Sequence, residues 1–312
     1  MPEPVLVVER VGPLALLQDL GRPGHGRLGV PPSGAVDRPA LRLANRLVGN
    51  AEGEAVVEVL LGGLTVRADA ATVVAVTGAP APLTVAGRSA PMHAAVLLAA
   101  GEALTLGRPV LGLRSYLAVR GGLAVPRTLG SASTDVASGL GPPPLRQGQR
   151  LPVGTSAPGP VRGSDVAGVH AGPPRPVVLR AVVGPRDDWF GAEALRLLGT
   201  SAWQVTPDSD RVGVRLGGPV LPRGRTEELL SEGVVRGSVQ VPASGQPLVF
   251  LADHPTTGGY PVVAVVVDED TDLLAQVVPG EAIRFSLRRA GWLPEAGRRA
   301  GLPEAGRRAG TG

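Results

Sequence analysis

Short runs of aliphatic residues, bounded by glycine or proline, recur along nearly the whole chain of 312 residues. The chain contains 45 glycines and 32 prolines, enough to place turns between many short segments. Valine-rich and leucine-rich runs of this length, separated by turn-forming residues, are typical of an all-β barrel or sandwich. We therefore predict a mainly β fold, with strands near residues 5–10, 14–19, 56–61, 64–68, 72–78, 95–100, 115–122, 177–184, 211–216, 238–241 and 283–287.

Two segments have helical periodicity instead. In residues 37–50, small and aliphatic side chains recur on one helical face after Asp37, a predicted N-cap. In residues 187–201, Asp188 is the predicted N-cap and Gly199 the predicted end of the helix. Two helices among more than ten strands do not alternate as βαβ units require. We therefore expect only a few short helices on a β scaffold.

A boundary is expected near the middle of the chain. Residues 152–176 are rich in proline and glycine and have no periodicity, as in a linker or a long surface loop. This pattern predicts an N-terminal subdomain over 1–160 and a C-terminal subdomain over 161–290. Residues 291–312 contain the sequence LPEAGRRAG twice in succession, with no apolar face, and we expect this tail to be disordered.

The composition excludes several classes of function. All 31 positively charged residues are arginine, so the chain cannot carry biotin on a lysine, form a Schiff base or contain a P-loop. Without cysteine it has no disulfide or thiol nucleophile, and its four scattered histidines predict no metal site. The sequence has no basic stripe interleaved with aromatic residues, so it does not predict nucleic-acid binding. The sequence has no apolar run long enough to span a membrane and no signal-peptide pattern. We therefore expect a cytoplasmic location.

The first polar cluster lies in residues 17–38, where a predicted strand gives way to a glycine-rich loop. Gln18, Asp19 and Arg22 begin this loop, whose successive backbone N–H groups can form an anion-binding concavity. The alternative is an Asp–Arg pair that only braces a long loop. The spacing of these residues leaves both interpretations open.

Two further polar clusters precede predicted strands in the second half of the chain. Asp210 and Arg211 can form a turn with a surface ion pair. Glu232 and Gln240 lie within the segment 231–242. An inward-pointing glutamine or glutamate in a barrel is costly unless it is paired. These two residues are therefore either site residues or exposed on an outer face.

The fourth polar cluster separates two aliphatic runs at 247–252 and 262–267 and is too long for a simple hairpin turn. Asp253 and His254 are candidates for an acid–base pair. The glycines allow close approach of the backbone to a ligand, and the hydroxyl groups can donate hydrogen bonds. Candidate ligand-binding residues are Thr256, Thr257, Gly258, Gly259 and Tyr260. The alternative is a structural Ω-loop.

Several long motifs resemble the biotin-dependent carboxyltransferase family, in order from residue 5 to residue 288. They are LQDLGRPGHGRLGVPPSGAVDRPALRLANRLVGN, RSYLAVRGGLAVPRTLGSASTD, VVGPRDDWF, SDRVGVRL, SEGVVRGSVQVP and LADHPTTGGYP. The resemblance implies two cyclophilin-like β-barrel subdomains with a site between them. It also implies a heteromeric partner, the B component of such complexes.

The family resemblance implies three alternative functions. The first is the C component of a bacterial 5-oxoprolinase, which with the A and B components opens a lactam at the expense of ATP bound by another chain. The second is a Kip antagonist-type regulator that sequesters an inhibitor resembling the B component. The third is a carboxyltransferase acting on urea or another amide, with biotin on a separate chain. The substrates of the two enzymes share a planar N–C=O group.

The resemblance also implies a set of site residues. The proposed catalytic acids are Asp19, Glu232 and Asp253. The proposed substrate-binding residues are Gln18, Arg22, Gln240, Thr256, Thr257, Gly258, Gly259 and Tyr260. The chain departs from its relatives in two places, because His254 precedes the threonines and Pro261-Val262 stands where many relatives have a basic residue.

Overall fold

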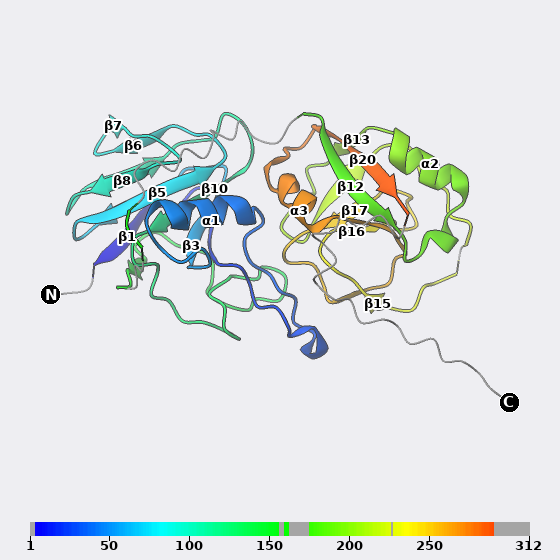
Figure 1. The fold of residues 1–312 in the computed structure, drawn as a ribbon, viewed down its shortest axis with the longest axis horizontal. Coiled ribbons are helices and arrows are strands. Elements are labelled where there is room, and N and C mark those ends of the chain that lie inside the picture. Colours follow the sequence, from blue (N-terminus) through cyan, green and yellow to red (C-terminus); the bar gives the residue numbers. More distant parts are fainter. Residues whose placement is uncertain (1–3, 156–158, 162–174, 226, 290–312) are drawn as a thin grey trace.

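The computed structural model describes residues 4–155, 159–161, 175–225 and 227–289. The repeat predicted to be disordered lies outside the described residues, as does most of the predicted linker. The described residues form an N-terminal lobe (residues 4–155) and a C-terminal lobe (residues 175–289), which lie side by side (Figure 1). The two lobes share no β-sheet.

The N-terminal lobe consists of two β-sheets packed face to face. The six-stranded sheet has the order β11 (Arg150–Pro152), β1 (Val5–Arg10), β4 (Thr65–Ala68), β9 (Ala103–Leu106), β6 (Leu83–Val85) and β7 (Arg88–Ser89). The five-stranded sheet has the order β2 (Leu14–Gln18), β3 (Val56–Leu60), β10 (Arg114–Val119), β5 (Thr72–Gly78) and β8 (Ala95–Leu98). Alternate residues such as Ala15 and Leu17 of β2 point into a core of valine and leucine.

Helix α1 (Arg38–Leu47) covers the outer face of the five-stranded sheet (Figure 1). Its apolar side chains pack against residues of this sheet that include Tyr116 and Ala118. The Asp37 carboxylate caps the helix by accepting a hydrogen bond from the backbone N–H of Ala40 at 3.0 Å. The predicted helix and its N-cap are thus confirmed.

The C-terminal lobe is a closed barrel of seven strands. Their order is β12 (Val177–Val183), β19 (Val262–Val266), β16 (Ser238–Gln240), β17 (Leu248–Phe250), β14 (Gly213–Gly217), β13 (Trp203–Val205) and β20 (Ala282–Arg288). The parallel pair β12–β20 closes the barrel around a core of aliphatic side chains and Trp203. A separate two-stranded sheet joins β15 (Glu232–Gly233) and β18 (Thr257–Gly258). The predicted mainly β fold with few short helices is confirmed.

The helical segments of the C-terminal lobe differ from the prediction. Asp188 does not cap a helix, because it lies in the 3₁₀ turn η2 (Asp187–Trp189), and α2 (Ala192–Thr200) begins after Gly191 and continues past Gly199. The extended backbone of Phe190 separates the two, and its side chain is buried in the barrel core together with that of Trp189. The remaining segments are η1 (Gly26–Leu28), α3 (Asp268–Thr271) and η3 (Asp272–Gln276).

The segment formed by α3 and η3 joins the two lobes. The Asp272 carboxylate of η3 accepts hydrogen bonds from the Arg38 guanidinium of α1 at 2.9 and 3.0 Å. The Gln276 side chain accepts from the backbone N–H of Arg114 at 3.1 Å and donates to its carbonyl at 2.9 Å. These contacts hold the edge of one lobe against the other. None of the helices within the described ranges has the length and apolarity to cross a membrane.

Asp37, which accepts a hydrogen bond from Gln276 across the interface, should make the free energy of unfolding depend on pH. Burial raises the pKa of Asp37 from 3.8 to about 6, with the charges of Asp272 and Glu58 adding to the rise and hydrogen bonds from Gln276 and Ala40 opposing it. The folded state therefore holds the Asp37 proton more tightly than the unfolded state does. Stability is lost as the pH rises from about 4 to about 6, by at most about 3 kcal/mol.

Asp37→Asn removes this titration and keeps an N-cap residue. We expect the variant to gain stability relative to the wild type by up to about 3 kcal/mol between about pH 4 and pH 7. Urea denaturation of both proteins across this range measures the difference. A difference that does not change with pH would contradict the prediction, whatever its constant size.

Candidate functional site

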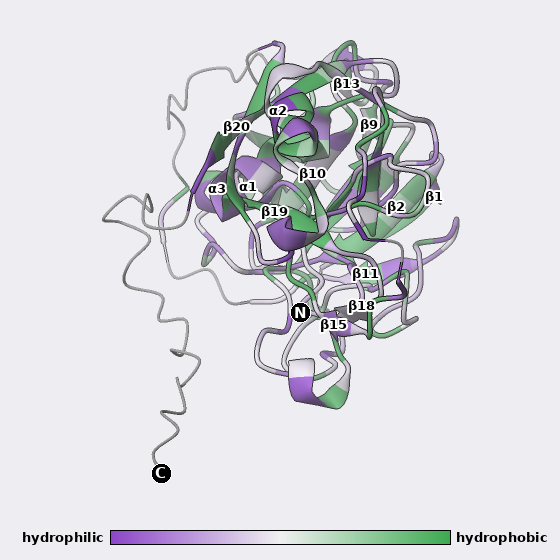
Figure 2. Ribbon diagram, turned by 90° about the vertical axis from the view of Figure 1, so that its right-hand side faces the viewer, coloured by the Kyte–Doolittle hydropathy of each residue, from purple (hydrophilic) through white to green (hydrophobic). Residues whose placement is uncertain are grey.

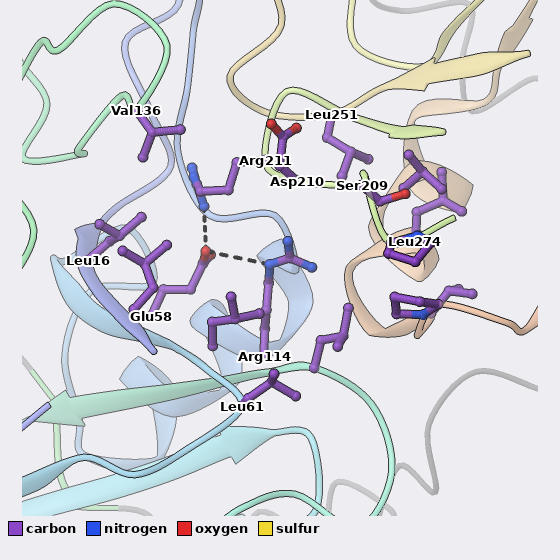
Figure 3. A pocket seen from close by; sticks show the side chains of 17 residues that line it. Leu16, Glu58, Leu61, Arg114, Val136, Ser209, Asp210, Arg211, Leu251 and Leu274 are labelled. Atoms are coloured by element: carbon purple, nitrogen blue, oxygen red, sulfur yellow. Dashed lines mark hydrogen bonds and ion pairs between the residues drawn. The ribbon is translucent and has the colours of Figure 1, made fainter. Parts of the chain in front are cut away.

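A cavity of about 510 Å³ lies between the two lobes. This volume is within the usual range for small-molecule sites. Its walls are mostly aliphatic, and five polar residues project into it. The N-terminal lobe supplies Leu14, Leu16, Glu58, Leu60, Leu61, Leu113, Arg114 and Val136, and the C-terminal lobe supplies Pro207, Ser209, Asp210, Arg211, Val214, Leu251, Leu274, Val277 and Pro279 (Figure 3).

Arg211 forms the ionic centre of this cavity. Its Nε and Nη2 donate to the two oxygens of Asp253 at 2.8 and 3.0 Å. Its Nη1 donates to the Glu58 carboxylate of the other lobe, and Nη2 also donates to the carbonyl of Gly34 at 2.7 Å. Burial by itself would lower the pKa of Arg211, but Glu58 and Asp253 more than compensate and raise it. Arg211 is therefore a charged, buried link between the lobes.

The predicted surface ion pair between Asp210 and Arg211 is wrong. Asp210 does form a turn, because its carboxylate accepts from the backbone N–H groups of Val212 and Gly213 at 2.8 and 3.1 Å. The Arg211 side chain is only 3% exposed and points toward the N-terminal lobe. Its partners come from other parts of the chain, so neighbouring residues could not reveal them.

Glu58 connects the ionic centre to the N-terminal lobe. One carboxylate oxygen accepts from the Tyr116 hydroxyl at 2.9 Å and from the backbone N–H of Val36 at 3.1 Å. The other oxygen accepts from Arg211 and lies 3.8 Å from the Arg114 Nε. Burial, together with the charge of Glu58, raises the pKa of Tyr116 well above its usual value. The Tyr116 hydroxyl is thus a neutral donor in this network.

Asp253 connects the ionic centre to the first polar cluster of the sequence. It accepts from the Ser33 hydroxyl at 2.7 Å and from the backbone N–H of Val136 at 3.1 Å. The Thr134 carbonyl accepts from both the Ser33 hydroxyl at 3.2 Å and the Gln18 amide at 2.8 Å. Gln18 and Asp253 therefore belong to one network, although they lie far apart in the sequence.

Asp19 and Arg22 both hydrogen-bond to residues 128–133. Within the described residues they do not pair with each other. The Asp19 carboxylate accepts from the hydroxyls of Ser131 and Ser133, both at 2.6 Å, and from the backbone N–H of Ala132 at 2.7 Å. Arg22 donates to the carbonyls of Thr128 and Ser133. Both residues brace the loop, although the predicted Asp–Arg contact is replaced by shared contacts with residues 128–133.

Three buried polar atoms beside this loop have no hydrogen-bond partner among the described residues. They are Gln18 Oε1, Arg22 Nη1 and Asp135 Oδ2. Burial without a partner is costly for such groups. Gln18 and Arg22 each use another atom of the same side chain to hold the neighbouring backbone. The unpaired atoms therefore retain hydrogen-bonding capacity for water or a ligand.

The remaining predicted residues gather at the small sheet of β15 and β18. Glu232 lies opposite Gly258, and its carboxylate accepts from Arg186 Nε at 2.8 Å. Gln240 is buried and donates to the Tyr260 carbonyl at 2.9 Å, which fixes the loop that carries Thr256, Thr257 and Gly259. The Tyr260 side chain is half exposed. The loop of η1 lies at the same end of the molecule (Figures 1 and 2).

The predicted acid–base pair of Asp253 and His254 does not form. Asp253 faces Arg211, whereas His254 Nδ1 lies 2.6 Å from the Pro255 carbonyl. Burial lowers the pKa of His254, so this ring is neutral near neutral pH. Within the described residues, no group of three or more histidine, aspartate and glutamate side chains could hold a metal ion.

Local sequence patterns do not single out three polar residues of this site, two of which line the cavity. Glu58 and Arg114 line the cavity and Tyr116 donates to Glu58, and all three lie within strands β3 and β10. A charged residue inside VVEVLL was an available signal, because a buried carboxylate in a strand needs a partner. The identity of that partner, Arg211, was not accessible from spacing.

Residues 28–287 match the family described as the carboxyltransferase domain, subdomains A and B. The chain belongs to this carboxyltransferase family. Its match to the C component of the 5-oxoprolinase of Escherichia coli is 39% identical over 284 residues and covers 90% of each chain. The corresponding component of Haemophilus influenzae is 36% identical over 274 residues and covers 87% of each chain.

Solved structures share this fold. The urea amidolyase of K. lactis superposes with a TM-score of 0.84 at 29% identity, over 91% of this chain. The chain spans only 19% of that much longer protein. It also spans 56% of the chain in the crystal structure of TTHA0988, at 40% identity and a TM-score of 0.80. The fold of this chain thus also occurs within longer polypeptides.

Proposed function

We propose that this carboxyltransferase-family chain is the C component of a 5-oxoprolinase. The observation that carries the proposal is the match to the E. coli protein, which extends over 90% of both chains. The cavity between the lobes supports it, because aliphatic walls around a few fixed polar groups suit a compact ring with a planar amide. The reaction proposed for the complex is the ATP-dependent opening of 5-oxoproline to glutamate.

The residues of this chain would bind the lactam and move protons during its opening. Of the three acids proposed for catalysis, Asp253 contacts two cavity-lining residues, Arg211 and Val136. We assign the proton transfer to Asp253. Asp19 would fix the binding loop, and Glu232 would fix the β15–β18 sheet. Gln18 and Arg22 retain unpaired polar atoms that could meet a polar group of the substrate.

The proposal includes partners and cofactors on other chains. The A and B components of the enzyme would assemble with this chain, and one of them would bind ATP. Any biotin used by a related reaction must be carried elsewhere, because the 312 residues contain no lysine. The proposal also keeps the cytoplasmic location expected from the sequence.

A reconstitution experiment tests this function. The purified chain is combined with the A and B components and assayed for glutamate release from 5-oxoproline with ATP, and for urea-dependent ATP hydrolysis in parallel. We expect turnover of 5-oxoproline only when all three proteins are present. Assembly without turnover would favour the regulatory alternative, and urea turnover with a biotin carrier would favour the carboxyltransferase alternative. The similarity to K. lactis urea amidolyase is the observation behind that last alternative.

A further inference from the structure

We infer that Arg114 binds the carboxylate of the substrate in the interlobe cavity and thereby selects small carboxylate-bearing lactams over neutral amides such as urea. This inference rests on the proposed function and adds a residue to it. Two arginines line the cavity, Arg114 and Arg211, and they differ in how many of their N–H groups have an acceptor.

Arg114 extends from strand β10 of the N-terminal lobe into the space between the lobes (Figure 3). Its Nη1 donates to the carbonyl of Ala275 at 2.8 Å, and its Nε lies 3.8 Å from the Glu58 carboxylate. Its Nη2 has no acceptor among the described residues. Because a guanidinium carries five N–H donors in a fixed plane, Arg114 retains donors for a carboxylate ligand.

Arg211, in contrast, has an acceptor for each of its guanidinium nitrogens. Each of its three nitrogens donates to a carboxylate oxygen of Asp253 or Glu58, and Nη2 also donates to the Gly34 carbonyl. Both carboxylates are thus engaged closely by Arg211, whereas Glu58 approaches Arg114 only at 3.8 Å. Of the two cavity arginines, Arg114 is the one whose charge an incoming carboxylate can meet directly.

The surroundings of Arg114 position its guanidinium and shape the rest of the site. Gln276 holds the backbone of Arg114 from the opposite lobe through two hydrogen bonds. The cavity walls include Leu16 and Leu274, which offer apolar contact to the methylene groups of a small ring. Urea has neither a carboxylate nor methylene groups. The combination of a cation and an aliphatic wall therefore fits a lactam carboxylic acid better than urea.

The test uses the complex reconstituted with the A and B components. Arg114→Gln removes the charge, and we expect the KM for 5-oxoproline to rise about 10- to 100-fold, as for the loss of a hydrogen bond to a charged group. Arg114→Lys keeps the charge and should show a smaller rise. Arg108→Gln removes an exposed arginine outside the cavity and should leave KM unchanged.

Two competitive inhibitors separate charge recognition from loss of structure. 2-Pyrrolidone keeps the lactam and lacks the carboxylate, so its inhibition constant should be the same for the wild type and Arg114→Gln. Cyclopentanecarboxylate keeps the carboxylate, and its inhibition should weaken in Arg114→Gln by about the same factor as KM. Should the glutamine variant not fold, inhibition of the wild type decides. Cyclopentanecarboxylate should then bind, and its failure to compete would overturn the inference.

The outcomes distinguish this inference from the proposed function. An unchanged KM in a folded Arg114→Gln variant overturns the role of Arg114 while the function stands. A wild-type complex that does not turn over 5-oxoproline overturns the proposed function itself.

Discussion

Replacement of Arg211 by methionine should lower the free energy of unfolding by about 3–5 kcal/mol. The guanidinium is buried between the carboxylates of Glu58 and Asp253, which belong to different lobes. Without it, two negative charges remain in a poorly hydrated interface with no cation between them. Methionine fills much of the same volume as arginine. The expected loss of stability therefore comes from the unpaired carboxylates and not from a cavity. Urea denaturation at neutral pH measures it.

Two further variants give this prediction its controls. Arg215→Met removes an exposed arginine from the nearby strand β14 and should change stability by less than about 0.5 kcal/mol. Combining Arg211→Met with Glu58→Gln and Asp253→Asn removes all three charges together. If the ionic centre is the cause, the triple variant should be more stable than Arg211→Met alone. A triple variant that is less stable would contradict the explanation.

Asp253→Asn should lower kcat for 5-oxoproline by about 10²- to 10⁴-fold in the reconstituted complex, the usual effect of losing an acid–base group. Arg211, Ser33 and the backbone N–H of Val136 hold this carboxylate in one orientation beside the cavity. An asparagine of the same shape cannot exchange the proton. Steady-state kinetics should show a large fall in kcat with a much smaller change in KM.

The activity prediction needs a control for folding, because Asp253 also pairs with Arg211. Asp188→Asn removes an exposed carboxylate that pairs with Arg225 at 3.1 Å and should keep full activity. The Asp253→Asn protein must also assemble with its partners and show a cooperative unfolding transition at the assay temperature. Near-normal kcat in such a protein would exclude Asp253 as the proton-transfer group. Asp19 and Glu232 would then be the remaining candidates.

Local sequence patterns predicted the parts of the fold that depend on local chemistry. Alternating aliphatic residues specify which face of a strand is buried, and Asp37 followed by an apolar stripe specifies a capped helix. The grouping of Glu232 with the loop at 256–260 was also predicted, and the pairing of β15 with β18 produces it. These features need only neighbouring residues or a resemblance between motifs.

The site could be predicted only in part, because its central contacts join distant residues. Arg211 and Glu58 are 153 positions apart, and Ser33 and Asp253 are 220 positions apart. A turn sequence containing Asp210 and Arg211 looks like an exposed ion pair until the opposing lobe is present. Arg114 was overlooked for the same reason, since the cavity that it lines exists only when both lobes are in contact.

The divided ionic centre has a consequence for synthesis of the chain on the ribosome. Glu58 emerges long before Arg211, so a nascent N-terminal lobe must fold while its future cation has not yet been made. We expect that lobe to keep Glu58 hydrated and its interface face open until translation has passed residue 288, the end of the strand β20 that closes the barrel. Protease protection of stalled nascent chains should therefore increase abruptly beyond that length. A gradual increase would show that the N-terminal lobe folds independently of the C-terminal lobe.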